Sequence, residues 1–206
     1  MTDEARAVVL ARIRAALGPE RPTVDVPRDY RRVGVHPAGD PALLDLITDR
    51  LVDYRAAVHR CPPGAVPAAI AAALPPGARV LVPGGLPPGW APPDATVDDP
   101  RFDPFALDGF DAVVTACAAA VAETGTIALD GAPDQGRRAI SLIPDRHVCV
   151  VRAEQVVHTV PEFLARLDPT RPLTLVSGPS ATSDIELQRV EGVHGPRTLI
   201  VILAAG

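Results

Sequence analysis

The chain has 206 residues, of which 47% are hydrophobic and only 3% aromatic, and its formal net charge is -5. This length suits one α/β domain with room for an appendage, and it leaves too little chain for two full catalytic domains. The scarcity of aromatic residues and the absence of a contiguous basic block argue against a nucleic-acid-binding surface.

Missing residue types restrict the chemistry further. All 20 basic residues are Arg, and the chain contains neither Lys nor Asn. The absence of Lys excludes a Schiff-base nucleophile, a pyridoxal-phosphate anchor and the ammonium group of a phosphate-binding loop. Cys61, Cys117 and Cys149 are far apart in sequence, so we expect neither a metal site nor a cofactor in this chain. Because no signal-peptide pattern or membrane-length apolar run is present, we expect a soluble, cytoplasmic protein without a membrane span.

The N-terminal third predicts two helices joined by an arm. Residues 2–17 have amphipathic helical spacing and end before Gly18. This helix packs either on its own domain or on a partner subunit. The Pro-rich residues 18–41 predict an extended arm, so the expected domains are 1–39, a helix with an arm, and 40–206, an α/β domain. Asp40 and Pro41 mark the start of a second helix, with an apolar stripe that continues to Tyr54.

The middle of the chain predicts a parallel β-α-β unit followed by an irregular segment. Strands are expected at 57–61 and 79–82, with an Ala-rich helix at 66–74 between them. Residues 83–104 contain two Gly/Pro clusters and the only Trp, Trp90. This segment is either a functional lid or a surface insertion anchored by Trp90, and the second is favoured.

The C-terminal half continues the alternation of strands and helices. The Ala-rich segment 117–126 is interpreted as a helical turn or a packed connection. Strands are expected at 111–116, 127–129, 147–151, 173–176 and 198–203, and helices at 137–142 and 160–167. This order predicts a three-layer α/β fold with a mostly parallel sheet.

Polar residues concentrate between the last two expected strands, 173–176 and 198–203. Loops at the carboxyl ends of parallel strands often bind ligands, so this segment is either a ligand loop or a turn-rich surface connection. Its first residues, 177–180, could offer N–H groups and hydroxyls to an anion. Asp184, Glu186 and His194 could bind a cation or act as acid and base, although a histidine between glycines is more typical of a turn. No Gly-x-Ser-x-Gly elbow is present, which argues against a serine hydrolase.

Glu123 is a second candidate for chemistry. It is a lone carboxylate in apolar surroundings beside Gly125 and two threonines. Burial would raise the pKa of such a carboxylate, although the residue could equally cap a local turn.

Three motifs carry a resemblance to a known family. They are Ala-Glu-Thr-Gly-Thr (122–126), Ser-Gly-Pro-Ser-Ala-Thr-Ser-Asp-Ile-Glu (177–186) and Gly-Val-His-Gly-Pro-Arg (192–197). In this order and spacing they resemble the lactate utilization protein C family, the short members of the LUD-domain superfamily, over roughly residues 40–206. The resemblance implies the fold of the sugar isomerase and coenzyme A transferase superfamily (the NagB/RpiA/CoA transferase-like fold). It also implies a role in oxidising L-lactate to pyruvate with iron-sulfur partner proteins, which would carry the clusters.

The motifs also supply the candidate site residues. Glu123 and Asp184 are the candidate catalytic residues. The candidate ligand-binding residues are Thr124, Gly125, Thr126, Ser177, Gly178, Ser180, Thr182, Glu186 and His194. The family resemblance implies a basic residue where this chain has Ala181 and an Ala where it has Ser183, and Arg189 or Arg197 could supply the missing positive charge.

Three functional hypotheses follow, and whether the chain is an enzyme stays open. The leading one is a subunit of a lactate utilization system that binds a small carboxylate or a partner through the 177–186 loop. The alternative is a free-standing isomerase- or transferase-type enzyme, with Glu123 or Asp184 as general base and the N–H groups of Gly125 and Gly178 as an oxyanion hole. The third is a non-catalytic binding module.

Overall fold

A computed structural model describes residues 2–18, 25–182, 190, 191 and 195–206, with the backbone alone at 182, 190 and 191. The chain divides into two compact units, Met1–Tyr30 and Arg31–Gly206, and each is described by itself.

The first unit contains helix α1 (Asp3–Leu17), as the sequence predicts. The side chain of Thr2 accepts a hydrogen bond from the Ala5 N–H and caps the start, and Gly18, with φ 71°, follows the end. No residue of α1 is buried, so its apolar side chains are all accessible.

The second unit is built on a six-stranded sheet in which every pair of neighbours is parallel, in the order β1-β12-β7-β4-β2-β3. The mostly parallel α/β sheet is therefore confirmed. Its strands are β1 (Ala57–Cys61), β2 (Val80–Val82), β3 (Thr96–Val97), β4 (Ala112–Thr115), β7 (Arg146–Arg152) and β12 (Thr198–Ala204).

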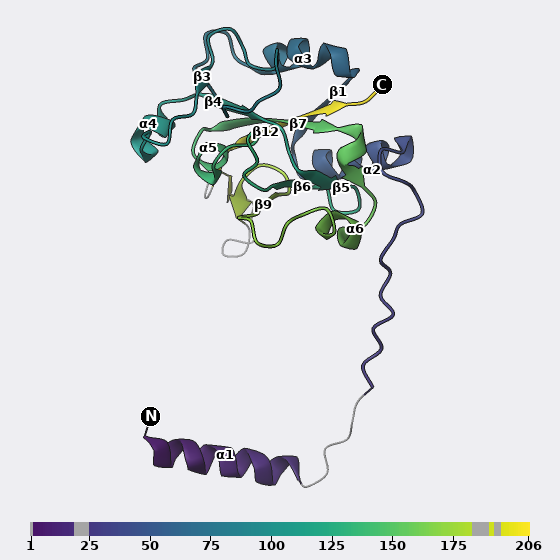
Figure 1. Cartoon of the computed structure of the whole chain (residues 1–206), viewed down its shortest axis with the longest axis vertical. Helices are drawn as coiled ribbons and strands as arrows, with labels where there is room; N and C mark the ends of the chain where they lie inside the picture. Colours follow the sequence, from purple (N-terminus) through teal and green to yellow (C-terminus); the bar gives the residue numbers. More distant parts are fainter. Residues whose placement is uncertain (1, 19–24, 183–189, 192–194) are drawn as a thin grey trace. The chain divides into compact units, whose positions relative to one another are not determined.

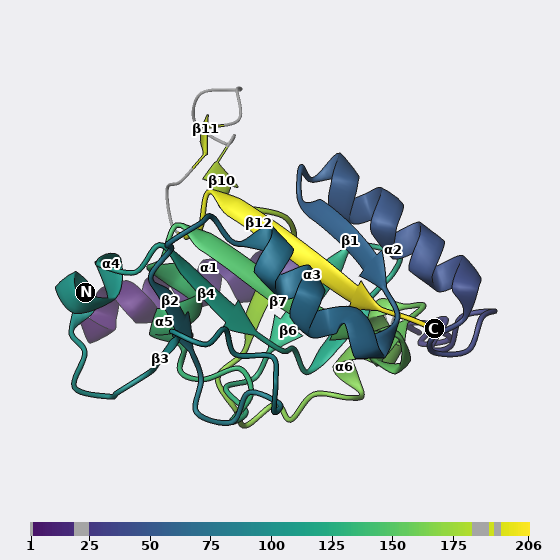
Figure 2. The same ribbon diagram turned by 90° about the horizontal axis from the view of Figure 1, so that it is seen from above.

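Helices cover both faces of this sheet, with α3 (Val66–Ala73) on one side and α2 (Pro41–Asp53) on the other (Figures 1 and 2). Alternate side chains of β7 and β12 face opposite ways. Val150 and Ile202 pack with α3, whereas Val151 and Leu203 pack with α2. Asp40 caps α2 by accepting a hydrogen bond from the Ala42 N–H at 2.8 Å, as expected from the sequence. The shorter helices are α4 (Pro104–Asp108), α5 (Arg138–Leu142) and α6 (Val160–Leu164), with 3-10 turns η1 (Pro63–Ala65) and η2 (Ala153–Gln155).

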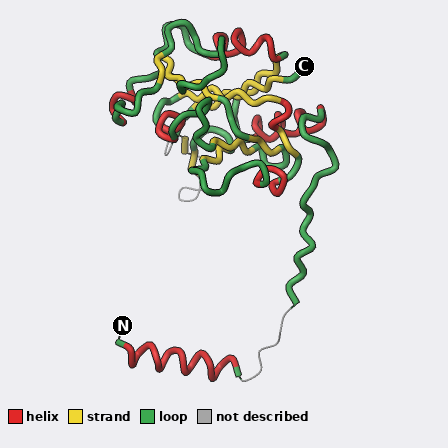
Figure 3. Tube along the Cα trace, in the orientation of Figure 1, coloured by secondary structure: helices red, strands yellow, loops and turns green. Residues whose placement is uncertain are grey.

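A second sheet shares the layer of α2, and the sequence did not predict it. Its four strands lie in the order β8-β5-β6-β9, and β6 is antiparallel to both β5 and β9. Figure 3 shows the strands of both sheets in yellow. The strands of the second sheet are β5 (Ala119–Val121), β6 (Thr126–Leu129), β8 (Val156–Val157) and β9 (Thr174–Val176), and β10 (Ala181–Thr182) pairs separately with β11 (Val190–Glu191).

Two expectations are corrected by this sheet. The Ala-rich segment was interpreted as a helical turn or connection, but Ala119–Val121 is a fully buried strand. Small side chains fit there because the strand lies between the α2 layer and α6, and this packing outweighs the weak strand preference of Ala. The run 173–176 was expected in the parallel sheet, but β9 lies at the edge of the second sheet.

The last part of the arm, residues 31–40, belongs to the second unit and packs within it. Residues 31–40 form no helix or strand, but the Gly34 N–H donates to Glu162 at 3.2 Å and the Val35 N–H to His158 Nδ1 at 3.2 Å. The Gly39 N–H donates to the Val156 carbonyl at 3.0 Å. The arm is thereby tied to β8 and α6.

The irregular segment 83–104 is anchored as predicted. Trp90 is half-buried against the apolar cluster beneath α3. β3 adds an edge strand to the sheet, and Asp98 forms an ion pair with Arg137 at 2.9 Å. These contacts support the interpretation of a surface insertion.

We expect Thr159 to be the most important capping residue where the arm meets the start of α6. Its hydroxyl takes part in a capping box with Glu162 and contacts the Arg32 carbonyl at 3.4 Å. Thr159→Ala should lower the free energy of unfolding by about 1–2 kcal/mol, which corresponds to a melting point lower by about 2–8 °C. Thermal unfolding measures this, with Thr170→Ala as control because that hydroxyl bonds only the exposed turn residue Asp168. Equal melting points for the two variants would contradict the prediction.

Candidate functional site

A cavity of about 350 Å³ lies under the segment that follows β9. It is lined by Ser141, Leu142, His147, residues 174–181, Gly195, Pro196 and Leu199. His147 and Leu199 are the second residues of β7 and β12, so the cavity lies at the amino ends of these strands. The sequence led us to expect a site at the carboxyl ends. The cavity lies elsewhere because the expected strand 173–176 is β9 of the second sheet, and the chain returns from it to the start of β12.

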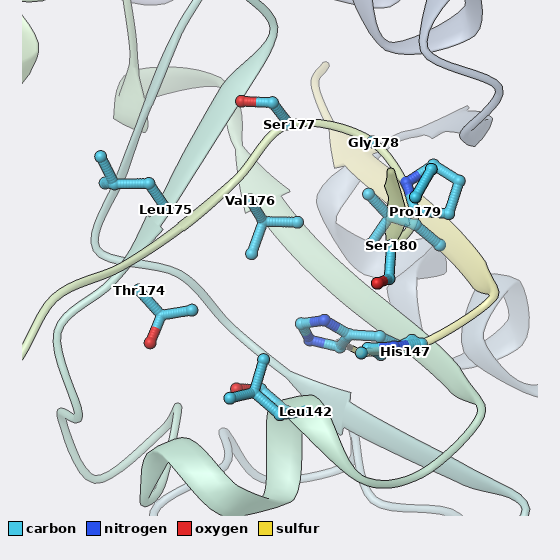
Figure 4. A pocket seen from close by; sticks show the side chains of 14 residues that line it. Leu142, His147, Thr174, Leu175, Val176, Ser177, Gly178, Pro179 and Ser180 are labelled. Atoms are coloured by element: carbon cyan, nitrogen blue, oxygen red, sulfur yellow. The ribbon is translucent and has the colours of Figure 1, made fainter. Parts of the chain in front are cut away.

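His147 is the only ionisable side chain in the described lining of this cavity, and it was missed as a site residue. The ring is 2% exposed, and its Nε2 atom lies 2.8 Å from the hydroxyl of Thr115, which is fully buried at the end of β4. Burial disfavours the imidazolium and lowers the pKa of His147 from 6.5 to about 4, so the ring is neutral near pH 7. Nδ1 has no partner among the described residues, and the ring lies amid the lining side chains (Figure 4).

Two of the predicted motifs meet beside the cavity through a row of hydroxyls. Thr124 and Thr126 are hydrogen-bonded at 2.8 Å, and Thr126 is bonded to Ser177 at 2.8 Å. Ser177 lines the cavity, whereas the two threonines do not. Because β6 pairs antiparallel with β9, Thr126 lies next to Ser177. The row of hydroxyls therefore holds Ser177 in position at the cavity.

Gly125 and Gly178 have a structural reason to be glycine. Their φ angles are 61° and 78°, in the left-handed region. A Cβ atom at Gly125 would lie 2.7 Å from Arg50 Cβ, and one at Gly178 would lie 2.6 Å from Tyr54 Cβ. Both glycines thus let the motif loops approach the end of α2 closely, and only Gly178 lines the cavity.

Glu123 does not lie in the apolar surroundings that the sequence suggested. Its carboxylate forms an ion pair with Arg31, and its backbone carbonyl accepts a hydrogen bond from Arg50 Nε at 3.3 Å. The side chain is 30% exposed and does not line the cavity. The arm therefore supplies a counter-charge that sequence patterns did not reveal.

The remaining predicted residues divide into two groups. Ser180 and Ala181 line the cavity. Arg197 is held by Asp145, with 2.6 Å between Nε and Oδ1. Ser183, Asp184, Glu186, Arg189 and His194 lie outside the described residues, and Thr182 is described only as backbone in β10.

The cysteines do not fit an iron-sulfur cluster. Cys117 and Cys149 are buried, and their thiols donate to Gln155 Oε1 at 3.5 Å and to the Ala116 carbonyl at 3.8 Å. Within the described ranges, no three His, Cys, Asp or Glu side chains gather in a metal-binding arrangement. In the same part of the chain, every helix is too short or too polar to cross a membrane.

Comparison with known proteins gives the family. The model of the LUD domain matches residues 106–204. "Lactate utilization protein C" of Deinococcus radiodurans is 47% identical over 208 residues, which cover 98% of this chain and 96% of that protein. The chain belongs to the lactate utilization protein C family. All residues that line the cavity, from Ser141 to Leu199, fall within the LUD-domain match.

A second relative is less similar to this chain, and a crystal structure supports the fold. "Lactate utilization protein C" of Halalkalibacterium halodurans is 27% identical over 133 residues, 49% of this chain and 57% of that protein. The crystal structure of a DUF162 family protein from Deinococcus radiodurans superimposes with a TM-score of 0.68 at 44% identity, over 79% of this chain and 96% of that one. The α/β fold is thus shared with a solved relative.

Proposed function

We propose that this chain is a subunit of an L-lactate utilization system and binds a small 2-hydroxy or 2-oxo carboxylate in the cavity at His147. Iron-sulfur partner proteins would carry the electrons away, because the cysteines described here do not gather into a cluster site. The name and similarity of the Deinococcus relative support the pathway. The observation that supports ligand binding is the buried, neutral His147, whose Nδ1 atom has no hydrogen-bond partner among the residues that the structure describes.

The pairing of His147 with Thr115 suits both lactate and pyruvate. If Thr115 donates to Nε2, the proton of the neutral ring is on Nδ1, which can then donate to a carbonyl oxygen. If Nε2 donates to Thr115, Nδ1 is free to accept a hydrogen bond from a hydroxyl. One site can therefore hold the 2-hydroxy acid and the 2-oxo acid with a change of tautomer and no change of charge.

Hydroxyl groups complete the uncharged part of the site. Ser177 and Thr174 lie along the segment that lines the cavity, and the Ser141 hydroxyl donates to the Arg138 carbonyl at 3.0 Å and keeps its lone pairs. Ala181 places no charge in the lining, so a carboxylate bound here would need its counter-charge from elsewhere.

His147→Gln is expected to abolish most of the binding of L-lactate. At a concentration 100 times the dissociation constant, a ligand of the folded state adds about 2.7 kcal/mol of stability, which raises the melting point by several degrees. We expect this rise for the unmodified chain with L-lactate or pyruvate, and less than half of it for His147→Gln. His59→Gln is the matched control, because His59 is an exposed histidine on β1. Equal shifts for the two variants would refute the proposed role of His147.

A free-standing enzyme is the second candidate, and the same histidine favours it. A neutral imidazole can accept a proton from a carbonyl substrate in place of Glu123, although its pKa of about 4 makes it a weak base near pH 7. Turnover of lactate, a sugar phosphate or an acyl-coenzyme A substrate by the purified chain alone would support this candidate. Lactate oxidation that appears only when iron-sulfur partner proteins are added would support the subunit.

A further inference from the structure

A second cavity of about 280 Å³ adjoins the first, and Ser141 and Thr174 line both. Its other walls come from residues 129–131 after β6, 135–138 before α5, and 171–172 before β9. The first cavity has no charged side chain in its described lining, whereas the second has three arginines and one aspartate. The two cavities together thus form one polar but neutral compartment and one cationic compartment.

The three arginines keep N–H groups available for a ligand. Arg137 is fixed by Asp98, to which its Nε and Nη2 atoms each donate at 2.9 Å, and its Nη1 atom has no partner in the described structure. Arg171 forms an ion pair with Asp130 through Nη1 at 2.9 Å. Arg138 makes no ion pair or side-chain hydrogen bond with any described residue. Asp98 and Asp130 balance two of the three arginines, so the cavity keeps an excess of positive charge, although the net charge of the chain is -5.

Residues 130–135 of the cavity wall are held in place by their own hydrogen bonds. Gln135 is 3% exposed and accepts a hydrogen bond from the Asp130 N–H at 2.6 Å. Asp130 in turn accepts one from the Ala132 N–H at 3.1 Å. A wall that is already ordered reduces the loss of conformational entropy when a ligand binds.

We infer that the second cavity is an anion subsite, which holds the carboxylate of a ligand whose hydroxyl or carbonyl end lies at His147. This inference rests on the proposed function and adds the counter-charge that the first cavity lacks. The planar guanidinium group presents paired N–H groups that match the two oxygens of a carboxylate or of a phosphate. Ser141 and Thr174 line both cavities, so the ligand lies at the boundary between them, with its C2 oxygen towards His147 and its carboxylate towards the arginines. Arg138 is the specificity-determining residue, because it is the arginine of this cavity whose side chain has no partner among the described residues.

The test compares L-lactate with lactamide, its uncharged amide, by calorimetric titration at constant ionic strength. The unmodified chain should bind L-lactate more tightly. Arg138→Gln should weaken L-lactate binding about tenfold or more and leave lactamide within about twofold, because only a charge-assisted hydrogen bond is lost. Arg138→Lys should recover part of the affinity, and Arg12→Gln, which alters an exposed arginine of α1, should change nothing. Arg138 is exposed, so the variant should keep the melting point of the parent chain.

The outcomes separate this inference from the proposed function. If L-lactate binds but Arg138→Gln does not alter its preference over lactamide, the subsite is refuted and the proposed function stands. If the unmodified chain binds neither compound, the proposed function fails. The anion subsite is then tested separately, by adding inorganic phosphate and following backbone amide signals. Shifts of the Gly131 and Gly136 amide signals with phosphate, lost in Arg138→Gln, would support the anion subsite, and unchanged signals would refute it.

Discussion

Gly125→Ala is expected to lower the free energy of unfolding by about 2–5 kcal/mol. A side chain at φ 61° costs about 1–2 kcal/mol by itself. The new methyl group would also lie 2.7 Å from Arg50 Cβ and 3.2 Å from the Arg50 carbonyl carbon, and such overpacking costs about a further 1–3 kcal/mol. Gly178→Ala should behave in the same way, because its Cβ would lie 2.8 Å from the Tyr54 carbonyl oxygen. Chemical denaturation with urea measures both effects.

Two other glycines provide matched controls. Gly77 has φ 73° but nothing within 4 Å of the added Cβ, so Gly77→Ala isolates the backbone cost. Gly64 has neither a positive φ nor a neighbour within 4 Å, and Gly64→Ala should have little effect. If Gly125→Ala lowered the free energy of unfolding by no more than Gly77→Ala, the prediction that the motif loop lies in close contact with α2 would be contradicted.

Acidification should destabilise the chain through His147 by about 3 kcal/mol between pH 7 and pH 4. Burial lowers the pKa of His147 to about 4 in the folded state, whereas the unfolded chain has a histidine pKa near 6.5. Between these values the unfolded chain binds a proton that the folded chain does not bind. The stabilisation is therefore complete above pH 6.5 and is lost as the pH falls towards 4, at about 1.4 kcal/mol per pH unit.

The contribution of His147 is measured as a difference between variants. His147→Gln should flatten the dependence of unfolding free energy on pH between 6.5 and 4, and His59→Gln should leave it unchanged. Other groups cancel in this comparison, including Asp134, whose carboxyl pKa is raised by burial and which acts in the opposite direction. An imidazole signal of His147 that titrates near pH 6.5 in the folded chain would show that the ring is not buried as described.

Most of the fold could be predicted from apolar periodicity and from the caps. Strands β7 and β12 are long, continuous apolar runs, and Asp40 with Pro41 marks the start of α2 clearly. The second sheet escaped prediction because two of the three residues of Ala119–Val121 are Ala, which does not favour strands, and the packing between layers makes this segment a strand. Local sequence does not show which sheet a strand joins, because strand pairing depends on contacts between distant parts of the chain.

The candidate site could be predicted only in part. Ser177, Gly178 and Ser180 were found because a family motif marks them, and they do line a cavity. His147 was missed because a single histidine at the start of an apolar strand looks like any core residue. Its importance depends on Thr115 and on the space beside it, which come from separate parts of the chain. The Arg31 partner of Glu123 was also missed, since 92 residues separate the two.

The position of β12 determines when the domain can form during protein synthesis. It lies between β1 and β7 in the sheet, where Ala57 pairs with Ile200 and Val148 also pairs with Ile200. Every other strand of the sheet therefore leaves the ribosome before the strand that joins β1 to the rest. Until β12 emerges, β1 has no partner strand, and the apolar sides of β7 and α2 that pack on β12 stay exposed to chaperones and to other nascent chains.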